Sequence, residues 1–205
     1  MTPSYWSRAA AELSSVDPVM AELVSRYGDL ALVSRGDPFA TLVRSIIGQQ
    51  ISVKAAEAVW GKFIAQIGTL TPARLLELGP EGLAGCGLSQ RKMEYLLDLS
   101  ASFSSGKLCP ADWDGLDDET LILELTTVRG IGRWTAEMFL IFNLLRPDVF
   151  PLDDIGLQRA VFKHYFAGEK CSWQALADFG ERWRPWRSVA TWYLWRSLDP
   201  LPVEY

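Results

Sequence analysis

The sequence predicts an all-α protein built as two lobes. Apolar residues recur at three- and four-residue intervals along most of the chain, which is the spacing of a buried helix face. Three capping side chains stand directly before a proline, a pair that commonly begins a helix; they are Asp17, Asp37 and Thr71. No stretch shows sustained alternation of apolar and polar residues between turn residues, so we expect little or no sheet.

The expected helices follow from these starts in chain order. Apolar residues at helical spacing follow the start at Asp37 and recur in the next segment as far as Ile67. A further helix is expected to start at Thr71, and Ser89 is expected to cap the one after it. Later helices are expected at 118–127, 133–145, 154–166, 172–183 and 185–198. We expect one lobe to comprise 37–115 and the other 116–205, with 1–36 packed on the second lobe.

The composition indicates a folded protein without a membrane segment or a metal centre. Of the 205 residues, 49% are hydrophobic, which is enough to bury a core. No apolar run approaches the roughly 20 residues that span a bilayer, and 1–11 lack a signal-peptide pattern, so we expect a cytoplasmic protein. The three cysteines are far apart and the single histidine has no ligand partner nearby, so we expect neither disulfides nor bound metal.

The net charge of −5 at first argues against a nucleic-acid partner, because such binding depends on neutralising phosphates. The charges are unevenly distributed, however, since acidic residues concentrate at 112–119. Basic residues recur around 128–133 and beyond, so a locally positive face is expected there. These residues are Arg129, Arg133, Arg159, Lys163 and Lys170.

A glycine-containing hairpin is expected at 128–133, with the sequence Val-Arg-Gly-Ile-Gly-Arg. Gly130 and Gly132 permit positive φ and close backbone approach, and a helix that begins near Arg133 offers unpaired N–H groups. A phosphate would fit such a hairpin. A plain corner between two helices explains the same glycines about as well.

Two adjacent carboxylates, Asp153 and Asp154, precede an amphipathic helical segment. An aspartate in this position commonly caps the helix. A cap requires only one carboxylate, so the other is available for chemistry or for solvent.

Four of the nine tryptophans lie at 183–195. Their helical spacing favours burial in a core. An aromatic wall beside a carboxylate would also suit a flat, electron-poor base, for which stacking contributes about 1–3 kcal/mol.

Five segments together resemble the helix-hairpin-helix DNA glycosylases. Four of them are 37–56, Gly-Leu-Ser-Gln-Arg-Lys at 87–92, the hairpin at 128–136 and Phe-Pro-Leu-Asp-Asp at 150–154. The fifth, 183–195, is similar to the C-terminal helix of the 3-methyladenine DNA glycosylase II branch. The resemblance covers about 37–197 in the family's order. It implies a single glycosylase unit with a DNA-binding cleft between two helical lobes, without that branch's N-terminal β-rich domain.

The resemblance also implies roles for individual residues. Asp154 matches the catalytic aspartate, with Asp153 as a cap or support. Trp134 and Trp195 correspond to walls of the base pocket, and Met138 to a softer wall. Relatives that also cut the strand carry a lysine at the position of Trp134, so an enzyme without lyase activity is expected.

Further contacts to substrate and DNA are implied by the same resemblance. Gln49 is assigned to the base site and Gln50 to the position that fills the gap left by the flipped base, although ordinary surface amides are the alternative. The DNA backbone is assigned to Gly130, Ile131, Gly132, Arg133 and Thr135. Backbone carbonyls of Thr126, Val128 and Ile131 are candidates to hold a monovalent cation, and no other cofactor is expected.

The function implied is excision of alkylated bases, such as 3-methyladenine and 7-methylguanine, from duplex DNA in base-excision repair. The expected partner is double-stranded DNA that contains alkylated bases, with no membrane and no obligate protein partner. There are two alternatives. One is a non-catalytic DNA-structure binder with the same hairpin, and the other is a glycosylase of this fold that acts on oxidised or mismatched bases.

Overall fold

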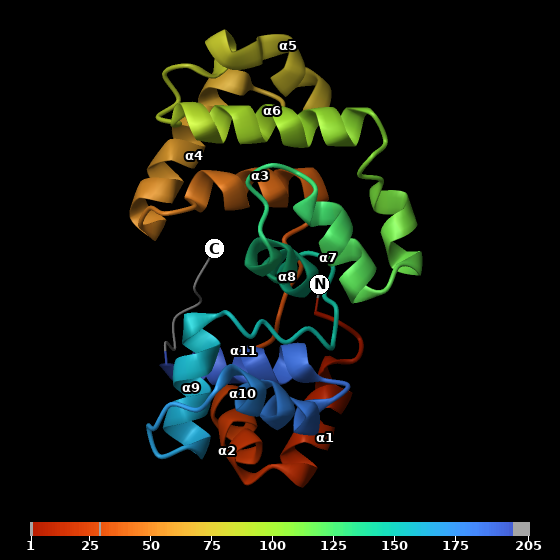
Figure 1. The fold of residues 1–205 in the computed structure, drawn as a ribbon, viewed down its shortest axis with the longest axis vertical. Helices are drawn as coiled ribbons and strands as arrows, with labels where there is room; N and C mark the ends of the chain where they lie inside the picture. The colour runs from red at the N-terminus through yellow and green to blue at the C-terminus, as the bar shows by residue number, and fades with distance from the viewer. Residues whose placement is uncertain (1, 29, 199–205) are drawn as a thin grey trace. The chain divides into compact units, whose positions relative to one another are not determined.

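The computed structural model describes residues 2–28 and 30–198, and within these residues it contains helices and no strand (Figure 1). The all-α prediction is therefore confirmed. None of the described helices combines the length and the hydropathy that a membrane span requires. The elements are α1 (Trp6–Val16), α2 (Pro18–Tyr27), α3 (Pro38–Gly48), α4 (Val53–Ile67), α5 (Pro72–Leu83), α6 (Gln90–Ser104), the 3-10 helix η1 (Pro110–Gly115), α7 (Asp118–Thr126), α8 (Arg133–Phe142), α9 (Ile155–Tyr165), α10 (Trp173–Gly180), the 3-10 helix η2 (Glu181–Trp183) and α11 (Arg187–Leu198).

The predicted helix starts are confirmed by their caps. Asp17 Oδ1 accepts hydrogen bonds from the backbone N–H groups of Val19 and Met20, at 2.9 and 3.2 Å, and a proline occupies the first turn. Asp37, Thr71 and Ser89 each accept one backbone N–H in the same way. These side chains satisfy amide groups that have no partner inside the helix, which fixes where α2, α3, α5 and α6 begin.

The chain forms two compact units. The terminal unit contains the described residues up to Ser34 together with Leu140–Leu198, and the central unit is Arg35–Phe139. In the terminal unit α1 and α2 pack on α11, and α9 packs on α11 as well; in the central unit α3, α4, α5 and α6 pack on one another (Figure 1).

The division therefore lies after Phe139 and not at 115/116, where the sequence analysis expects it. Buried aromatic side chains give the physical reason. The ring of Trp113 in η1 meets the edge of Phe103 at 6.1 Å and of Phe139 at 5.4 Å between centroids. These contacts join α6, η1 and the part of α8 up to Phe139 in one core.

The C-terminal end of α8 also differs from expectation, since it falls at Phe142 instead of 145. Leu145 has a φ of +57°, and the Arg146 N–H donates to the Leu140 carbonyl at 2.9 Å. A left-handed residue with a bond back to the last turn is a common way to end a helix.

Asp17 also links the separate helices of the terminal unit. Its side chain is 5% exposed, and Oδ2 accepts hydrogen bonds from the Tyr165 hydroxyl at 2.9 Å and from Trp183 Nε1 at 3.0 Å. Burial, together with the negative charge of Asp17, raises the pKa of Tyr165. One carboxylate thus caps the start of α2 and links it by hydrogen bonds to the C-terminal ends of α9 and η2.

Candidate functional site

The hairpin between α7 and α8 closes on itself and on α6. The Ile131 N–H donates to the Val128 carbonyl at 3.1 Å. Gly130 has a φ of +89°, and a Cβ built on it would lie 2.1 Å from Cδ2 of Tyr95. Both the backbone conformation and the contact with Tyr95 therefore require glycine at 130.

Gly132 plays a different part from the one the sequence suggests. It is absent from the described residues with positive φ, and a Cβ there would meet nothing within 4 Å. Gly132 therefore makes no use of the positive φ that glycine permits, and the close backbone approach expected there stays a prediction. What its position provides is an open, exposed approach to the backbone at the N-terminus of α8.

Side chains from two other segments hold the hairpin in place. Gln49 Nε2 donates to the Gly130 carbonyl at 2.8 Å, and the Arg129 N–H donates to Asp98 Oδ2 at 2.8 Å. Lys92 Nζ donates to the carbonyls of Ile47 and Gln49, at 2.6 and 2.8 Å, at the end of α3. Burial lowers the pKa of Lys92. The role of Gln49 in holding the hairpin is one that the sequence does not indicate.

Gln50 directly follows this anchored end of α3. It is exposed and has a φ of +60°, an unusual conformation for a residue other than glycine. Lys92 and Gln49 fix the backbone on its N-terminal side. The Gln50 side chain is thus presented to solvent from a constrained backbone.

The arginines of the hairpin are paired with acidic side chains of the protein. Arg129 contacts Glu94 at 3.1 Å, and Arg133 contacts both Glu119 and Glu137. Hydrogen bonding to Glu119 is the main cause of a raised pKa at Arg133. Their positive charge is largely balanced within the central unit, so the hairpin offers an anion its backbone rather than unpaired side-chain charge.

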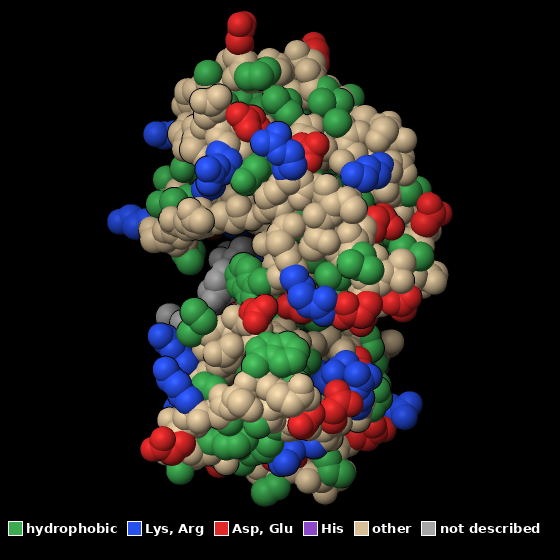
Figure 2. All heavy atoms as spheres, viewed as in Figure 1, with side chains coloured by type: hydrophobic (Ala, Val, Ile, Leu, Met, Phe, Trp, Pro, Cys, Tyr) green, Lys and Arg blue, Asp and Glu red, His purple; other side chains and the backbone are tan. Residues whose placement is uncertain are grey.

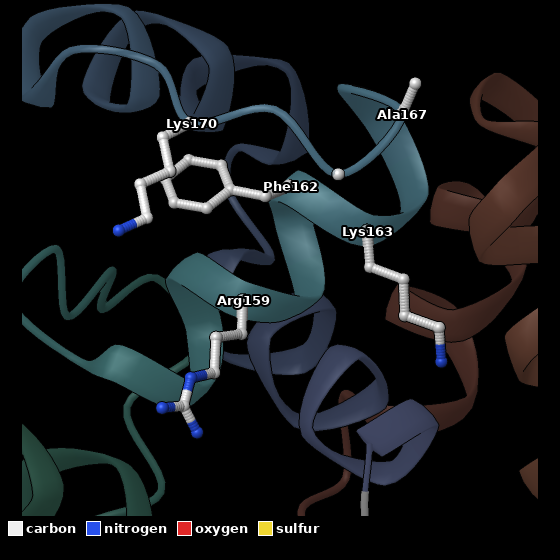
Figure 3. A pocket seen from close by; sticks show the side chains of 6 residues that line it. Arg159, Phe162, Lys163, Ala167 and Lys170 are labelled. Atoms are coloured by element: carbon white, nitrogen blue, oxygen red, sulfur yellow. The ribbon is translucent and has the colours of Figure 1, made fainter.

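The five basic residues expected around the hairpin fall in two different units, and their common positive face stays a prediction. Arg129 and Arg133 belong to the central unit and are ion-paired, whereas the other three belong to the terminal unit. Those three line a hollow on α9 and are Arg159, Lys163 and Lys170 (Figure 3).

The first turns of α8 carry further candidate residues of the central unit. Trp134 is half-buried, whereas Thr135 and Met138 are 7% and 6% exposed. Trp134 and Met138 are four residues apart and so lie on one face of the helix. The hairpin backbone therefore leads directly into an aromatic and a thioether side chain.

Asp154 caps α9 and is held by a tryptophan from α11. Its Oδ1 accepts the Leu157 N–H at 2.6 Å and Trp195 Nε1 at 2.8 Å, and the residue is 8% exposed. The adjacent Asp153 is exposed. Asp153 is therefore not the cap, because the carboxylate that caps the helix is also the buried one, and the other role expected of Asp153, a support, stays a prediction.

Two residues that the sequence analysis did not single out complete the surroundings of Asp154. The ring of Phe142 stacks on Trp195, with centroids 5.6 Å apart and planes 12° apart. Gly156 lies against Asp154 and Trp195, because a Cβ at that position would be 3.1 Å from Asp154 Oδ1 and 3.2 Å from Trp195 Cδ1. Glycine two residues after the aspartate was the available signal for this close packing.

The arrangement offers a buried carboxylate that can act electrostatically. Within the part of the chain that the structure describes, no group of three histidine, cysteine or acidic side chains is placed to hold a metal ion. Val128 is one of three residues whose carbonyls were expected to bind a monovalent cation, and its oxygen already accepts the Ile131 N–H. That cation stays a prediction.

Comparison with known proteins matches the same elements. The family model described as "HhH-GPD superfamily base excision DNA repair protein" matches residues 43–185, which include both the hairpin and Asp154. The putative DNA-3-methyladenine glycosylase YfjP of Bacillus subtilis is 30% identical over 188 residues, covering 88% of this chain and 66% of that protein.

Two solved structures share the whole fold. The crystal structure of a DNA-3-methyladenine glycosidase from Bacillus halodurans has a TM-score of 0.88 and 34% identity, covering 97% of this chain and 93% of that chain. The 3-methyladenine DNA glycosylase Mag1 of Schizosaccharomyces pombe, in complex with abasic DNA, has a TM-score of 0.79 and 30% identity, covering 97% and 99%.

Proposed function

The chain belongs to the HhH-GPD superfamily of base excision DNA repair proteins, and from this premise we propose that it is a DNA glycosylase that excises alkylated purines from duplex DNA. One observation carries the proposal. Asp154 is a buried carboxylate at the start of a helix, aligned by the indole N–H of Trp195. The names of the relatives, which are 3-methyladenine glycosylases, support the substrate class.

The reaction breaks the bond between C1′ of the sugar and a ring nitrogen of the base. The electron pair leaves with the base, and positive charge develops on the sugar, where a carboxylate stabilises it. Water then adds to C1′ and loses a proton, which leaves an abasic site. We assign the stabilising role, and the orientation of this water, to Asp154.

An alkylated purine suits a site with a single key carboxylate. Methylation at N3 of adenine or N7 of guanine gives the base a positive charge, so it leaves as a neutral molecule without prior protonation. Aromatic faces favour such a cationic ring. We assign contacts with the extruded base to Trp195, Trp134 and Met138, with Gln49 at its edge.

The hairpin is assigned to the phosphate backbone. The N–H groups of Gly130 and Gly132 precede the positive end of α8, with Ile131 between them, whose own N–H donates to the Val128 carbonyl, and Arg133 and Thr135 follow. Contacts of this kind position the enzyme without reading sequence. Gln50, exposed and conformationally constrained, is assigned to the gap left by the flipped base.

We also infer that the enzyme leaves the DNA strand intact. Strand cleavage by this superfamily requires an amine that forms a Schiff base with the sugar, and Trp134 occupies the corresponding position. The test is purified protein with methylated duplex DNA. Free methylpurine and heat-labile abasic sites are expected, without a borohydride-trapped protein–DNA adduct. Trapping of such an adduct would overturn the absence of lyase activity.

Replacing Trp195 with phenylalanine is expected to slow base release about tenfold. The substitution keeps an aromatic ring against Phe142 but removes the N–H donor to Asp154, and a hydrogen bond to a charged group contributes about 1.5–3 kcal/mol. Single-turnover kinetics on alkylated duplex would measure the effect.

Trp186→Phe is the matched control for this substitution. Trp186 Nε1 also donates to a carboxylate, Glu12 Oε2, at 2.6 Å, but at the opposite end of the segment 183–195. This variant should release base at the rate of the unmodified protein. Equal rates for both variants would show that the hydrogen bond to Asp154 has no part in the reaction.

A further inference from the structure

A hollow on the terminal unit is lined by cationic side chains outside the proposed catalytic site. Its volume is about 350 Å³, and it lies between α9 and the loop that follows. Figure 3 shows the side chains around it. The lining residues are Arg159, Phe162, Lys163, Ala167, Gly168 and Lys170.

The charged ends of two of these residues point in a common direction. In Figure 3 the guanidinium of Arg159 and the ammonium of Lys170 extend to the same side, and the ring of Phe162 lies beside the stem of Lys170. Lys163 extends in another direction from the next turn of the helix. Figure 2 shows Lys and Arg side chains gathered at the edge of the molecule over α9. The hollow is a cationic surface with an apolar floor.

Within the described part of the chain, the charges of this surface form no ion pairs. Among the described residues, no carboxylate forms an ion pair with Arg159, Lys163 or Lys170. Other arginines of the terminal unit do form such pairs: Arg8 with Glu12, Arg26 with Glu22, and both Arg184 and Arg187 with Asp148. In a chain of net charge −5, three unneutralised cations around one hollow represent a local excess of positive charge.

We propose that Arg159, Lys163 and Lys170 form a second binding surface for the phosphate backbone of duplex DNA, in addition to the hairpin. The proposal rests on the proposed DNA substrate and extends its contacts to a surface that the family resemblance did not assign. Charge complementarity favours the repeated phosphates of a DNA strand, and the exposure of all three side chains leaves them accessible to it.

The positions of these side chains along α9 agree with a DNA strand as the ligand. Arg159 is five residues beyond Asp154, and Lys163 is one turn further, about 6 Å along the helix axis. One strand of duplex DNA carries a phosphate about every 3.4 Å of axis, so side chains one turn apart on α9 can meet different phosphates. The helix that begins at the catalytic carboxylate thus carries phosphate contacts along its exposed side.

The test is the salt dependence of binding to undamaged duplex DNA by the Arg159→Gln/Lys170→Gln double variant. Each lost phosphate contact reduces the magnitude of the negative slope of log K against log salt by about 0.9. The variant is expected to reduce this magnitude by nearly two and to weaken binding at least about tenfold near 0.1 M salt. Because both side chains are exposed, the melting temperature should not change.

Lys62→Gln/Lys107→Gln is the matched control, because it removes two exposed charges from the central unit and gives the same net charge. Its slope should equal that of the unmodified protein. An equal loss of duplex affinity and of salt dependence in both variants would overturn the proposal in favour of general electrostatics. Unchanged DNA binding together with lost binding of inorganic triphosphate would overturn it in favour of a small-anion site.

Binding and base release separate this proposal from the proposed function. A protein that excises methylpurines with an unchanged salt slope in the double variant would refute the second surface alone. A protein with the expected change in slope that releases no base would refute the glycosylase function and leave the surface intact.

Discussion

Asp154→Asn is expected to reduce base release at least about 100-fold while leaving the fold and duplex binding intact. The asparagine carbonyl oxygen can still accept the Leu157 N–H and Trp195 Nε1, so the cap of α9 and the orientation of the tryptophan persist. What is lost is the negative charge beside the sugar, and removing one such stabilising group commonly costs 10²- to 10³-fold in rate, to order of magnitude. Single-turnover release of methylpurine measures the loss.

Asp153→Asn is the matched control, since it makes the same chemical change one residue earlier on an exposed side chain. It should retain nearly full activity. If Asp153→Asn were the inactive variant and Asp154→Asn remained active, the roles assigned to the two carboxylates would be reversed. A thermal melt of each variant shows whether lost activity reflects unfolding.

Gly130→Ala is expected to lower the free energy of unfolding by about 3 kcal/mol and to weaken binding of every duplex, damaged or not. Alanine at a φ of +89° is strained, and its Cβ would overlap the ring of Tyr95. Tyr95 or the hairpin must shift, and either movement displaces the N–H groups assigned to phosphate. Denaturant unfolding and titration with undamaged duplex measure the two effects.

Gly132→Ala is the control for that substitution. It adds the same methyl group two residues away, in open space and without a positive φ. Its stability should stay within about 0.5 kcal/mol of the unmodified protein, as for most surface substitutions. A stability loss at Gly132 equal to that at Gly130 would contradict the distinction between a packed glycine and an open one.

Much of the fold could be predicted because its signals are local. An aspartate or threonine before a proline begins a helix through contacts within four residues, and the structure shows those contacts at Asp17, Asp37 and Thr71. The boundary between the units is not local. It depends on Trp113 meeting Phe103 and Phe139, which are distant in sequence, and no linker marks it.

The candidate site divides in the same way. The hairpin and the paired aspartates are contiguous motifs and were identifiable from sequence. The ion pairing of the hairpin arginines could not be identified in this way, because Glu94 and Glu119 reach Arg129 and Arg133 from other helices. Which aspartate caps α9 likewise depends on Trp195, 41 residues away, and on the close packing of Gly156.

The most direct test of the central claim is a panel of duplexes that each carry one defined lesion, incubated with the protein under single-turnover conditions. Release of 3-methyladenine or 7-methylguanine, with an abasic site left in an unbroken strand, is the result expected. Faster release of oxidised guanine or mismatched thymine would contradict the substrate class. Binding to an abasic-site analogue without release of any base would contradict the enzymatic function itself.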